Sequence, residues 1–186
     1  MDLPAWNERY RCQEQSNAPT PLVIETARHL KPGRALDLAC GTGRNACWLA
    51  SNGWSVTAVD GSPVAIDKLR ARAGDLPIVA QTANLEKGEF TIAESSWDLI
   101  LICYYLQRDL FEQVKRGVAA GGIVIAIVHI AEAGESPGEH RLDHCLGPGE
   151  LADYFQGWEI LHLHEGASRD PAHRKASAEI VARRRC

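Results

Sequence analysis

Short apolar runs rich in Val and Ile alternate with helical patterns along most of the chain. Five of these runs predict strands, at residues 35–40, 55–60, 77–81, 97–103 and 123–129. Each run is continuous enough to be buried on both faces, as strands in the middle of a parallel sheet are. The alternation is typical of an α/β fold with helices on both faces of a mainly parallel sheet. We expect these five strands to form the centre of that sheet.

Helical patterns fill the connections between the predicted strands. The helices are expected at residues 44–52, 63–73 and 110–119. The second follows Ser62, a residue type that caps helix N-termini, and has Pro63 in its first turn. The third runs up to a Gly-Gly pair at 121–122, which is typical of a helix end.

The pattern changes after His129. Residues 131–140 are polar and predict a loop, and residues 147–155 predict a further helix. Two alternating runs, 158–166 and 176–184, predict a closing antiparallel pair of strands. We expect this last third of the chain to provide a lid over a substrate.

The length of the chain limits the number of domains. The chain has 186 residues, 45% of them hydrophobic, which is enough for one domain with a full core and too few for two ordinary ones. We therefore predict a single domain over residues 1–186. Its parts are an N-terminal flap and first helix (1–33), a cofactor-binding core (34–130), and a lid loop, helix and antiparallel strand pair (131–186).

Charge and cysteine content indicate the kind of partner and the compartment. The formal net charge is -4, so the chain lacks the basic excess that attracts nucleic acid, and we expect a small-molecule partner. Six cysteines without a CxxC pair predict free thiols in a reducing compartment and no metal site. No leader pattern or bilayer-length apolar stretch is present. We expect a cytoplasmic monomer or homodimer that does not bind a membrane.

A glycine loop follows the first predicted strand. Gly41 and Gly43 lie at its carboxyl end, where open α/β sheets bind ligands. Glycine allows close approach of the backbone and positive φ. Asp60 ends the second strand, 19 residues after Gly41, in the place of a carboxylate that accepts both hydroxyls of a ribose. These residues predict a cofactor that contains a nucleoside.

Asp37 distinguishes between two such cofactors. The spacing of Gly41, Gly43 and Ala46 also fits the degenerate dinucleotide fingerprint. A pyrophosphate in that loop would lie near the Asp37 carboxylate, and two anions repel each other. A sulfonium cofactor with an α-amino group brings positive charge instead. Asp37 therefore favours S-adenosylmethionine over NAD, and the length leaves no room for the separate catalytic domain of an oxidoreductase.

Five segments in order resemble the class I S-adenosylmethionine-dependent methyltransferases: LDLACGTGRNACWLA, VTAVDGSP, ANLEKGEF, SWDLILICYYLQRDLF and VAAGGIVIA. Within this superfamily, GRN after the glycine loop, RY near the start and PGELADYFQGWEIL resemble the small bacterial branch related to the tellurite-resistance methyltransferase. The resemblance implies a Rossmann-like domain with a seven-stranded, mainly parallel sheet whose last strand is antiparallel. That agrees with the predicted closing pair.

The resemblance also implies a set of cofactor-binding residues. Asp37 and the backbone of the loop would lie beside the methionine part, and Asp60 would bind the ribose. Gly61 and Ser62 would border the adenine. Asn84 stands before Leu85 where the family usually has an acid, and an asparagine oxygen still accepts a hydrogen bond from the adenine amino group. The implied set is Tyr10, Asp37, Ala39, Gly41, Gly43, Asp60, Gly61, Ser62, Asn84, Leu85 and Cys103.

Candidates for acceptor binding and catalysis follow from the same resemblance. Cys103 and Tyr104 close the fourth strand and are expected near the transferred methyl group, with Arg108 just beyond. Relatives carry a functional His-Arg pair in a late loop, which corresponds to His173 and Arg174. The pair His164-Glu165 competes for that position but would lose the arginine. We favour His173 as proton acceptor and Arg174 as anchor for an anionic acceptor.

These expectations describe an enzyme that transfers a methyl group from S-adenosylmethionine to a small acceptor and releases S-adenosylhomocysteine. The acceptor is expected to be a chalcogen oxyanion, a thiol or selenol, or another small metabolite. The displacement is in line at an activated carbon, so the protein mainly aligns the acceptor and excludes water. The alternative is a noncatalytic S-adenosylmethionine-binding sensor or regulatory protein that keeps the cofactor residues.

Overall fold

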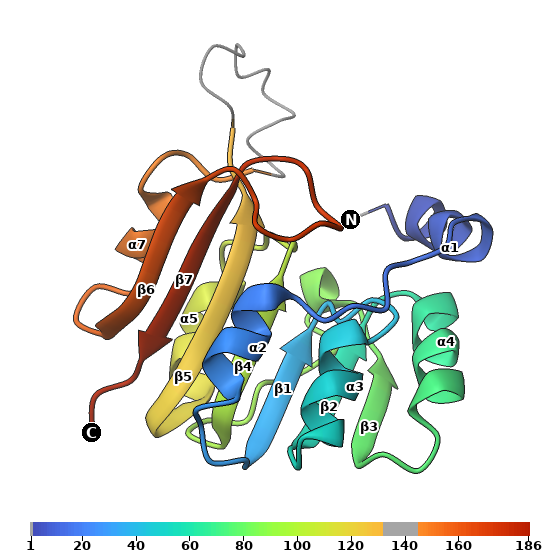
Figure 1. Cartoon of the computed structure of the whole chain (residues 1–186), viewed down its shortest axis with the longest axis horizontal. Helices are drawn as coiled ribbons and strands as arrows, with labels where there is room; N and C mark the ends of the chain where they lie inside the picture. Colours follow the sequence, from blue (N-terminus) through green and yellow to red (C-terminus); the bar gives the residue numbers. More distant parts are fainter. Residues whose placement is uncertain (1, 132–144) are drawn as a thin grey trace. The chain divides into compact units, whose positions relative to one another are not determined.

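The computed structural model describes residues 2–131 and 145–186 (Figure 1). Contacts within the chain divide it into two compact units, Met1–Ala93 and Glu94–Cys186. The interpretation of the chain as a single domain stays a prediction. Most of the predicted lid loop lies outside the described residues.

The first unit contains three parallel strands in the order β3-β2-β1. Asp37 pairs with Ala58 across β1 and β2, and Asp60 pairs with Thr82 across β2 and β3. The carboxyl ends of all three strands therefore share one edge. The elements are α1 (Leu3–Cys12), α2 (Pro21–Ala27), β1 (Arg34–Leu38), α3 (Arg44–Ser51), β2 (Ser55–Asp60), α4 (Pro63–Ala73), β3 (Ile78–Thr82) and the short 3-10 helix η1 (Leu85–Lys87).

Helices α3 and α4 pack on these strands, and α1 packs on α4. The N-terminus of α4 is capped as predicted, because the hydroxyl of Ser62 accepts a hydrogen bond from Ala65 N at 3.1 Å. Helix α3, expected at residues 44–52, buries Asn45, Ala46, Leu49 and Ala50. The local signals in this unit thus agree with the packing.

The prediction that every strand is buried on both faces is wrong for β3. Val79, in the middle of this strand, is 57% exposed. Strand β3 ends the strand order of the sheet, so β2 is its one neighbour there. A short apolar run therefore marks a strand without showing how many neighbours cover it.

The second unit contains strands in the order β4-β5-β7-β6. Strands β4 and β5 are parallel, and β7 is antiparallel to both β5 and β6. This confirms the closing antiparallel pair. The elements are β4 (Trp97–Cys103), α5 (Leu110–Gly117), β5 (Val118–His129), α7 (Glu150–Asp153), β6 (Glu159–Gly166) and β7 (Ser177–Arg183). The helix expected at residues 147–155 is shorter than predicted.

The predicted end of the helix at residues 110–119 is wrong. Helix α5 ends at Gly117, and β5 begins at once with Val118. The Gly-Gly pair lies inside the strand, where Gly121 N donates to Arg184 O at 3.0 Å and Arg184 N donates to Gly122 O at 2.9 Å. The register with β4 shifts between Trp97 and Leu99. The two glycines therefore lie in an irregular part of a strand, which is another common place for glycine.

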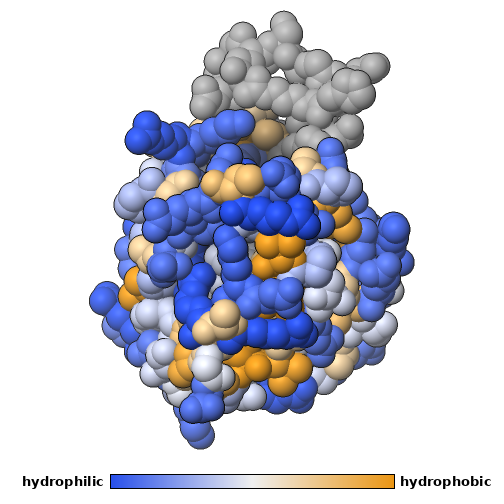
Figure 2. All heavy atoms as spheres, turned by 90° about the vertical axis from the view of Figure 1, so that its right-hand side faces the viewer, coloured by the Kyte–Doolittle hydropathy of each residue, from blue (hydrophilic) through white to orange (hydrophobic). Residues whose placement is uncertain are grey.

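Among the described residues, no helix has both the length and the apolar character needed to cross a membrane. On the face of the molecule shown in Figure 2, hydrophobic residues form small patches separated by hydrophilic ones.

Two glycines with positive φ allow a test of packing behind the glycine loop. Gly43 has φ +77, and a Cβ there would lie 2.2 Å from Leu69 Cδ1; Gly88 has φ +66 with open space around it. We expect Gly88→Ala to lower the free energy of unfolding by about 1 kcal/mol, the cost of the left-handed backbone. Gly43→Ala is expected to cost roughly 2 kcal/mol more through overpacking.

The measurement is urea unfolding of both variants beside the wild type. Equal losses for the two variants would contradict the close contact between the loop and α4.

Candidate functional site

Three loops of the first unit leave the same edge of the parallel sheet, after β1, β2 and β3. They contain residues 39–43, 61–62 and 83–84. In open α/β sheets this edge, beyond the carboxyl ends of the strands, is where ligands bind. The residues predicted to bind a cofactor are concentrated here.

Asp60 connects all three loops. Its Oδ2 accepts from Gly41 N and its Oδ1 from Ser62 N, both at 2.8 Å. Its backbone oxygen accepts from Ala83 N at 3.0 Å. Asp60 is 5% exposed. Burial raises its pKa, and the two backbone hydrogen bonds oppose that rise. Each carboxylate oxygen keeps capacity for a further donor.

The glycine loop turns through left-handed conformations. Ala39, Gly41 and Gly43 have φ values of 52°, 56° and 77°. Such a conformation is uncommon for alanine, and backbone strain of this kind is concentrated at functional sites. Arg72 of α4 holds the loop, because its Nη2 donates to the backbone oxygen of Thr42 at 2.7 Å and to its hydroxyl at 3.0 Å. The loop is therefore fixed from the protein side.

Asp37 lies in β1 just before this loop and is 2% exposed. Its carboxylate has a hydrogen bond from the backbone of Ala46 and the positive charge of Arg44 nearby, yet burial raises the pKa of Asp37 to about 7. Its Oδ2 is buried without a hydrogen-bond partner. A buried polar atom without a partner costs free energy. A ligand that brings positive charge or a donor group to this oxygen would remove that cost.

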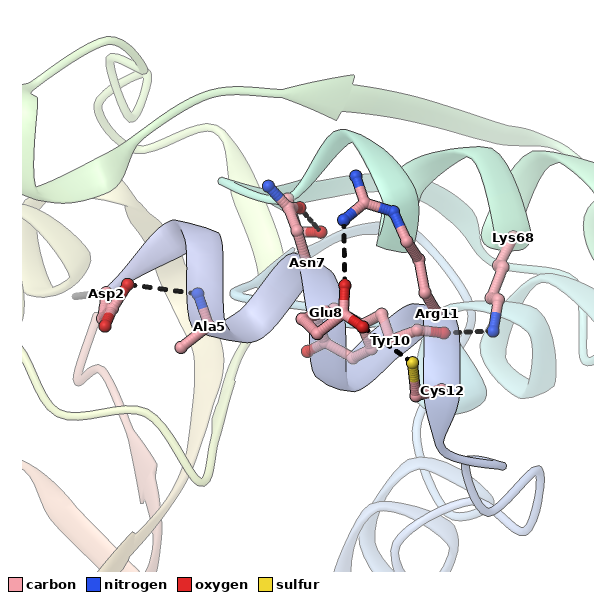
Figure 3. Close-up of polar contacts among 9 residues, drawn as sticks. Asp2, Ala5, Asn7, Glu8, Tyr10, Arg11, Cys12 and Lys68 are labelled. Atoms are coloured by element: carbon pink, nitrogen blue, oxygen red, sulfur yellow. Dashed lines mark hydrogen bonds and ion pairs between the residues drawn. The ribbon is translucent and has the colours of Figure 1, made fainter.

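Helix α1, part of the predicted flap, packs on α4, and Figure 3 shows polar contacts within α1 and between Tyr10 and Lys68 of α4. Tyr10 is buried, and its hydroxyl lies 3.1 Å from the place that a Cβ on Gly41 would take. Asn7 Oδ1 accepts from the hydroxyl of Ser62 at 2.5 Å. Lys68 of α4 donates to the backbone oxygen of Tyr10.

The two residues at the predicted adenine position begin the 3-10 helix η1. Asn84 Oδ1 accepts from Glu86 N at 3.0 Å and Lys87 N at 3.3 Å, and Leu85 is buried. The asparagine oxygen therefore caps η1, and a hydrogen bond to adenine would have to share it. Gly61 is close to α1, since a Cβ there would lie 2.8 Å from Leu3 Cδ2.

In the second unit, Tyr104 follows β4 with φ +61. Its ring stacks on the ring of His173, with centroids 3.4 Å apart and planes at 4°. Its hydroxyl donates to Asp170 Oδ2 at 3.1 Å. Cys103, the last residue of β4, is half-buried. Tyr104 and His173, 69 positions apart in the sequence, are thus brought together.

His173 and Arg174 lie in the loop between β6 and β7, as predicted. His173 is half-buried and Arg174 is exposed. His164, the competing histidine, lies within β6 and pairs with Glu179 of β7. Of the two histidines, His173 is therefore the one shown to stack on Tyr104, and the role of either in binding an acceptor stays a prediction.

Arg108 has partners within the second unit. Its Nε donates to Glu150 Oε1 at 2.6 Å, and its Nη2 donates to Glu150 Oε2 at 3.1 Å and to the backbone oxygen of Cys145 at 3.2 Å. This paired guanidinium fastens residues 145–150 to the start of α5. A substrate role for Arg108 stays a prediction.

His129, the last residue of β5, lies with its ring centroid 5.3 Å from Tyr104 and 5.6 Å from His173, and burial lowers its pKa. Sequence reasoning assigned it no site role and missed other residues around these sites. Asp170 stands before Pro171, a dipeptide that favours turns. No local signal marks the contact of Arg72 with the glycine loop. Among residues 2–131 and 145–186, no cluster of His, Cys, Asp or Glu is arranged to hold a metal ion.

Comparison with solved structures defines the class of fold. TehB from Haemophilus influenzae superposes with a TM-score of 0.74 at 20% identity, over 98% of this chain and 67% of that one. Phosphoethanolamine N-methyltransferase 2 from Haemonchus contortus, in complex with S-adenosyl-L-methionine, gives a TM-score of 0.74 at 15% identity, over 100% of this chain and 58% of that one. The chain thus has the Rossmann-like fold of S-adenosylmethionine-dependent methyltransferases, with the predicted seven strands, mainly parallel.

The family follows from the sequence match. The family described as tellurite resistance protein TehB matches residues 7–176, and the chain belongs to it. A probable S-adenosyl-L-methionine-dependent methyltransferase TehB from Haemophilus influenzae is 26% identical over 150 residues, covering 77% of this chain and 52% of the relative. The chain spans about half the length of the curated relatives it matches. The resemblance that the sequence motifs indicated is confirmed.

The buried carboxylate of Asp37 makes stability depend on pH. Its pKa is raised in the folded protein from 3.8 to about 7, so the folded state holds a proton that the unfolded state releases between these values. The unfolding free energy is expected to fall by roughly 4 kcal/mol as the pH rises through this window. Asp37→Asn removes the titration, so this variant is expected to be more stable than the wild type at pH 8.

Urea unfolding at pH 5 and pH 8 measures this, with Asp67→Asn, an exposed aspartate of α4, as control. The same pH dependence in Asp37→Asn and the wild type would contradict the assignment.

Proposed function

We propose that the chain binds S-adenosylmethionine with residues of its first unit, transfers the methyl group to a small acceptor and releases S-adenosylhomocysteine. The observation that carries this proposal is the buried Asp37, whose Oδ2 has no partner and which stands next to a strained glycine loop. Membership of the TehB family and the methyltransferase fold support it.

The donor set fits the cofactor in its charge. The sulfonium and the α-amino group carry positive charge, which Asp37 would stabilise directly or through water. Gly41 and Gly43 let the loop backbone approach the methionine part. The free lone pairs of Asp60 would accept the ribose hydroxyls. NAD fits less well, because its pyrophosphate would lie near the Asp37 carboxylate.

The other predicted residues would lie beside the adenine and the open side of the cofactor. Gly61, Ser62, Asn84 and Leu85 would border the adenine. Tyr10 lies close to Gly41 and would close the site from α1. Ala39 and Cys103 complete the set that the family resemblance implies.

The acceptor is the finer part of the proposal. The bond to the sulfonium breaks as the acceptor attacks in line, and a protonated acceptor must lose its proton. His173 would take that proton, Tyr104 would lie beside the acceptor, and the exposed Arg174 would bind an anionic acceptor, with Arg108 in support. The net charge of -4 argues against a nucleic-acid partner, and we propose a small acceptor such as a chalcogen oxyanion, thiol or selenol.

The test combines binding with turnover. Asp60→Ala is expected to weaken S-adenosylmethionine binding by at least about tenfold, because hydrogen bonds to a charged group are lost. Asp67→Ala, an exposed aspartate of α4, is the control. Calorimetric titration measures both. Unchanged affinity in a folded Asp60→Ala variant would remove the ribose assignment.

Turnover tests the acceptor side. His173→Ala is expected to lower the rate about a hundredfold or more with a protonated acceptor, and Arg174→Ala to raise KM for an anionic one. Cofactor affinity should not change in either variant, and Lys175→Ala is the neighbouring control. The readout is release of S-adenosylhomocysteine with selenite, tellurite and small thiols. Wild-type turnover in both variants would show that His173 and Arg174 have no role in catalysis. Binding of the cofactor without turnover of any tested acceptor would favour a sensor.

A further inference from the structure

A buried aspartate lies in the loop that carries His173. Asp170 is 4% exposed, unusual for a loop carboxylate, because such groups are rarely buried unless they are paired. Its Oδ2 accepts from the hydroxyl of Tyr104 at 3.1 Å, and its Oδ1 accepts from Ala172 N at 2.9 Å. The carboxylate therefore joins the loop between β6 and β7 to the end of β4.

The same residue folds the loop locally. Asp170 N donates to Ser168 Oγ at 3.2 Å, and His173 N donates to the backbone oxygen of Asp170 at 2.9 Å. Short polar side chains that bond to backbone two residues on stabilise turns of this kind. The turn directs the chain so that the ring of His173 meets the ring of Tyr104.

Tyr104 is itself held firmly. Its backbone N donates to Ile127 O at 2.6 Å, and its φ of +61° is rare for an aromatic residue. Burial raises the pKa of Tyr104, so its hydroxyl stays protonated and donates a hydrogen bond to Asp170. A strained residue persists where its surroundings fix it, and such residues are concentrated at functional sites.

The neighbouring residues fasten the loop at further points. Ser168 Oγ lies 3.4 Å from the Tyr104 hydroxyl. Arg169 Nη2 lies 3.5 Å from Glu179 Oε2, and Glu179 is buried in β7. Three consecutive loop residues thus contact β4 or β7 before the chain reaches His173.

We propose that Asp170 is a positioning residue, which holds His173 on the face of Tyr104 by bonding the Tyr104 hydroxyl and folding the loop. The purpose of that placement rests on the proposed function, in which His173 serves the methyl acceptor. The placement of the His173 ring on Tyr104 does not depend on the proposed function. His173 N donates to the backbone oxygen of Asp170, so the turn and Tyr104 transmit the effect of Asp170 to the imidazole.

The experiment measures the position of the His173 ring directly. In the stack, the ring protons of His173 lie over the Tyr104 ring, so their NMR signals are expected to be shifted upfield; His173→Gln assigns them. Asp170→Ala is expected to remove this shift, and Asp170→Asn, which keeps one acceptor oxygen, to remove part of it. Asp153→Asn, an exposed aspartate of the same unit, should leave the shift intact.

Kinetics give the second readout. With S-adenosylmethionine and a turned-over acceptor, Asp170→Ala is expected to lower kcat about tenfold or more, since a small misplacement of a catalytic group is costly. Cofactor affinity should stay within about twofold of the wild type, as expected for a residue outside the cofactor loops. Tyr104→Phe combined with Asp170→Ala should cost less than the sum of the two, since both act through one hydrogen bond.

The outcomes separate the two proposals. A wild-type His173 shift in a folded Asp170→Ala variant would overturn the positioning role, and Asp170→Asn serves if the alanine variant fails to fold. Loss of the shift with unchanged turnover would support the positioning of the ring and remove the catalytic role of His173.

Discussion

The candidate cofactor site depends on the hydrogen bonds that the Asp60 carboxylate accepts. By accepting from Gly41 N and Ser62 N at 2.8 Å, it fixes two loops that leave neighbouring strands. A buried carboxylate is costly unless donors surround it, and here the loop backbone supplies them. Asp37 differs, because one of its oxygens is buried with no partner. Asp60 connects the loops of the candidate site, and a cationic cofactor would supply the partner that the Asp37 carboxylate lacks.

In the second unit, a ring stack and a hydrogen-bonded turn hold the residues around Tyr104. Tyr104 leaves β4 in a left-handed conformation and stacks on His173, which comes from a loop far along the chain. The hydroxyl of Tyr104 donates a hydrogen bond to Asp170. The Tyr104 side chain therefore contacts the loop through both its ring face and its hydroxyl. Methyl transfer needs alignment more than strong chemistry from the protein. A rigidly held pair of rings is suited to that requirement.

The sequence predicted the parts of this protein that depend on local pattern. Apolar runs located five strands, alternating runs located the last two, and Ser62 was recognised as the cap of α4, because periodicity and capping act within a few residues. Asp37 was found by its charge just before the glycine loop, and Asp60 by its place at the end of a strand 19 residues after Gly41. The Gly-Gly pair led to a wrong prediction of where the helix at residues 110–119 ends, because glycine ends helices and also allows irregular strands. The contacts of Asn7, Arg72 and Asp170 were missed, because each depends on segments that only the fold brings together.

Calorimetric titration of the purified chain at pH 8 with S-adenosylmethionine, and in parallel with NAD, tests the central claim most directly. At this pH Asp37 is ionised, because its raised pKa is about 7. We expect saturable binding of S-adenosylmethionine and none of NAD. Binding of NAD in preference, or no binding of S-adenosylmethionine by the folded chain, would contradict the claim that Asp37, the glycine loop and Asp60 form a site for this cofactor.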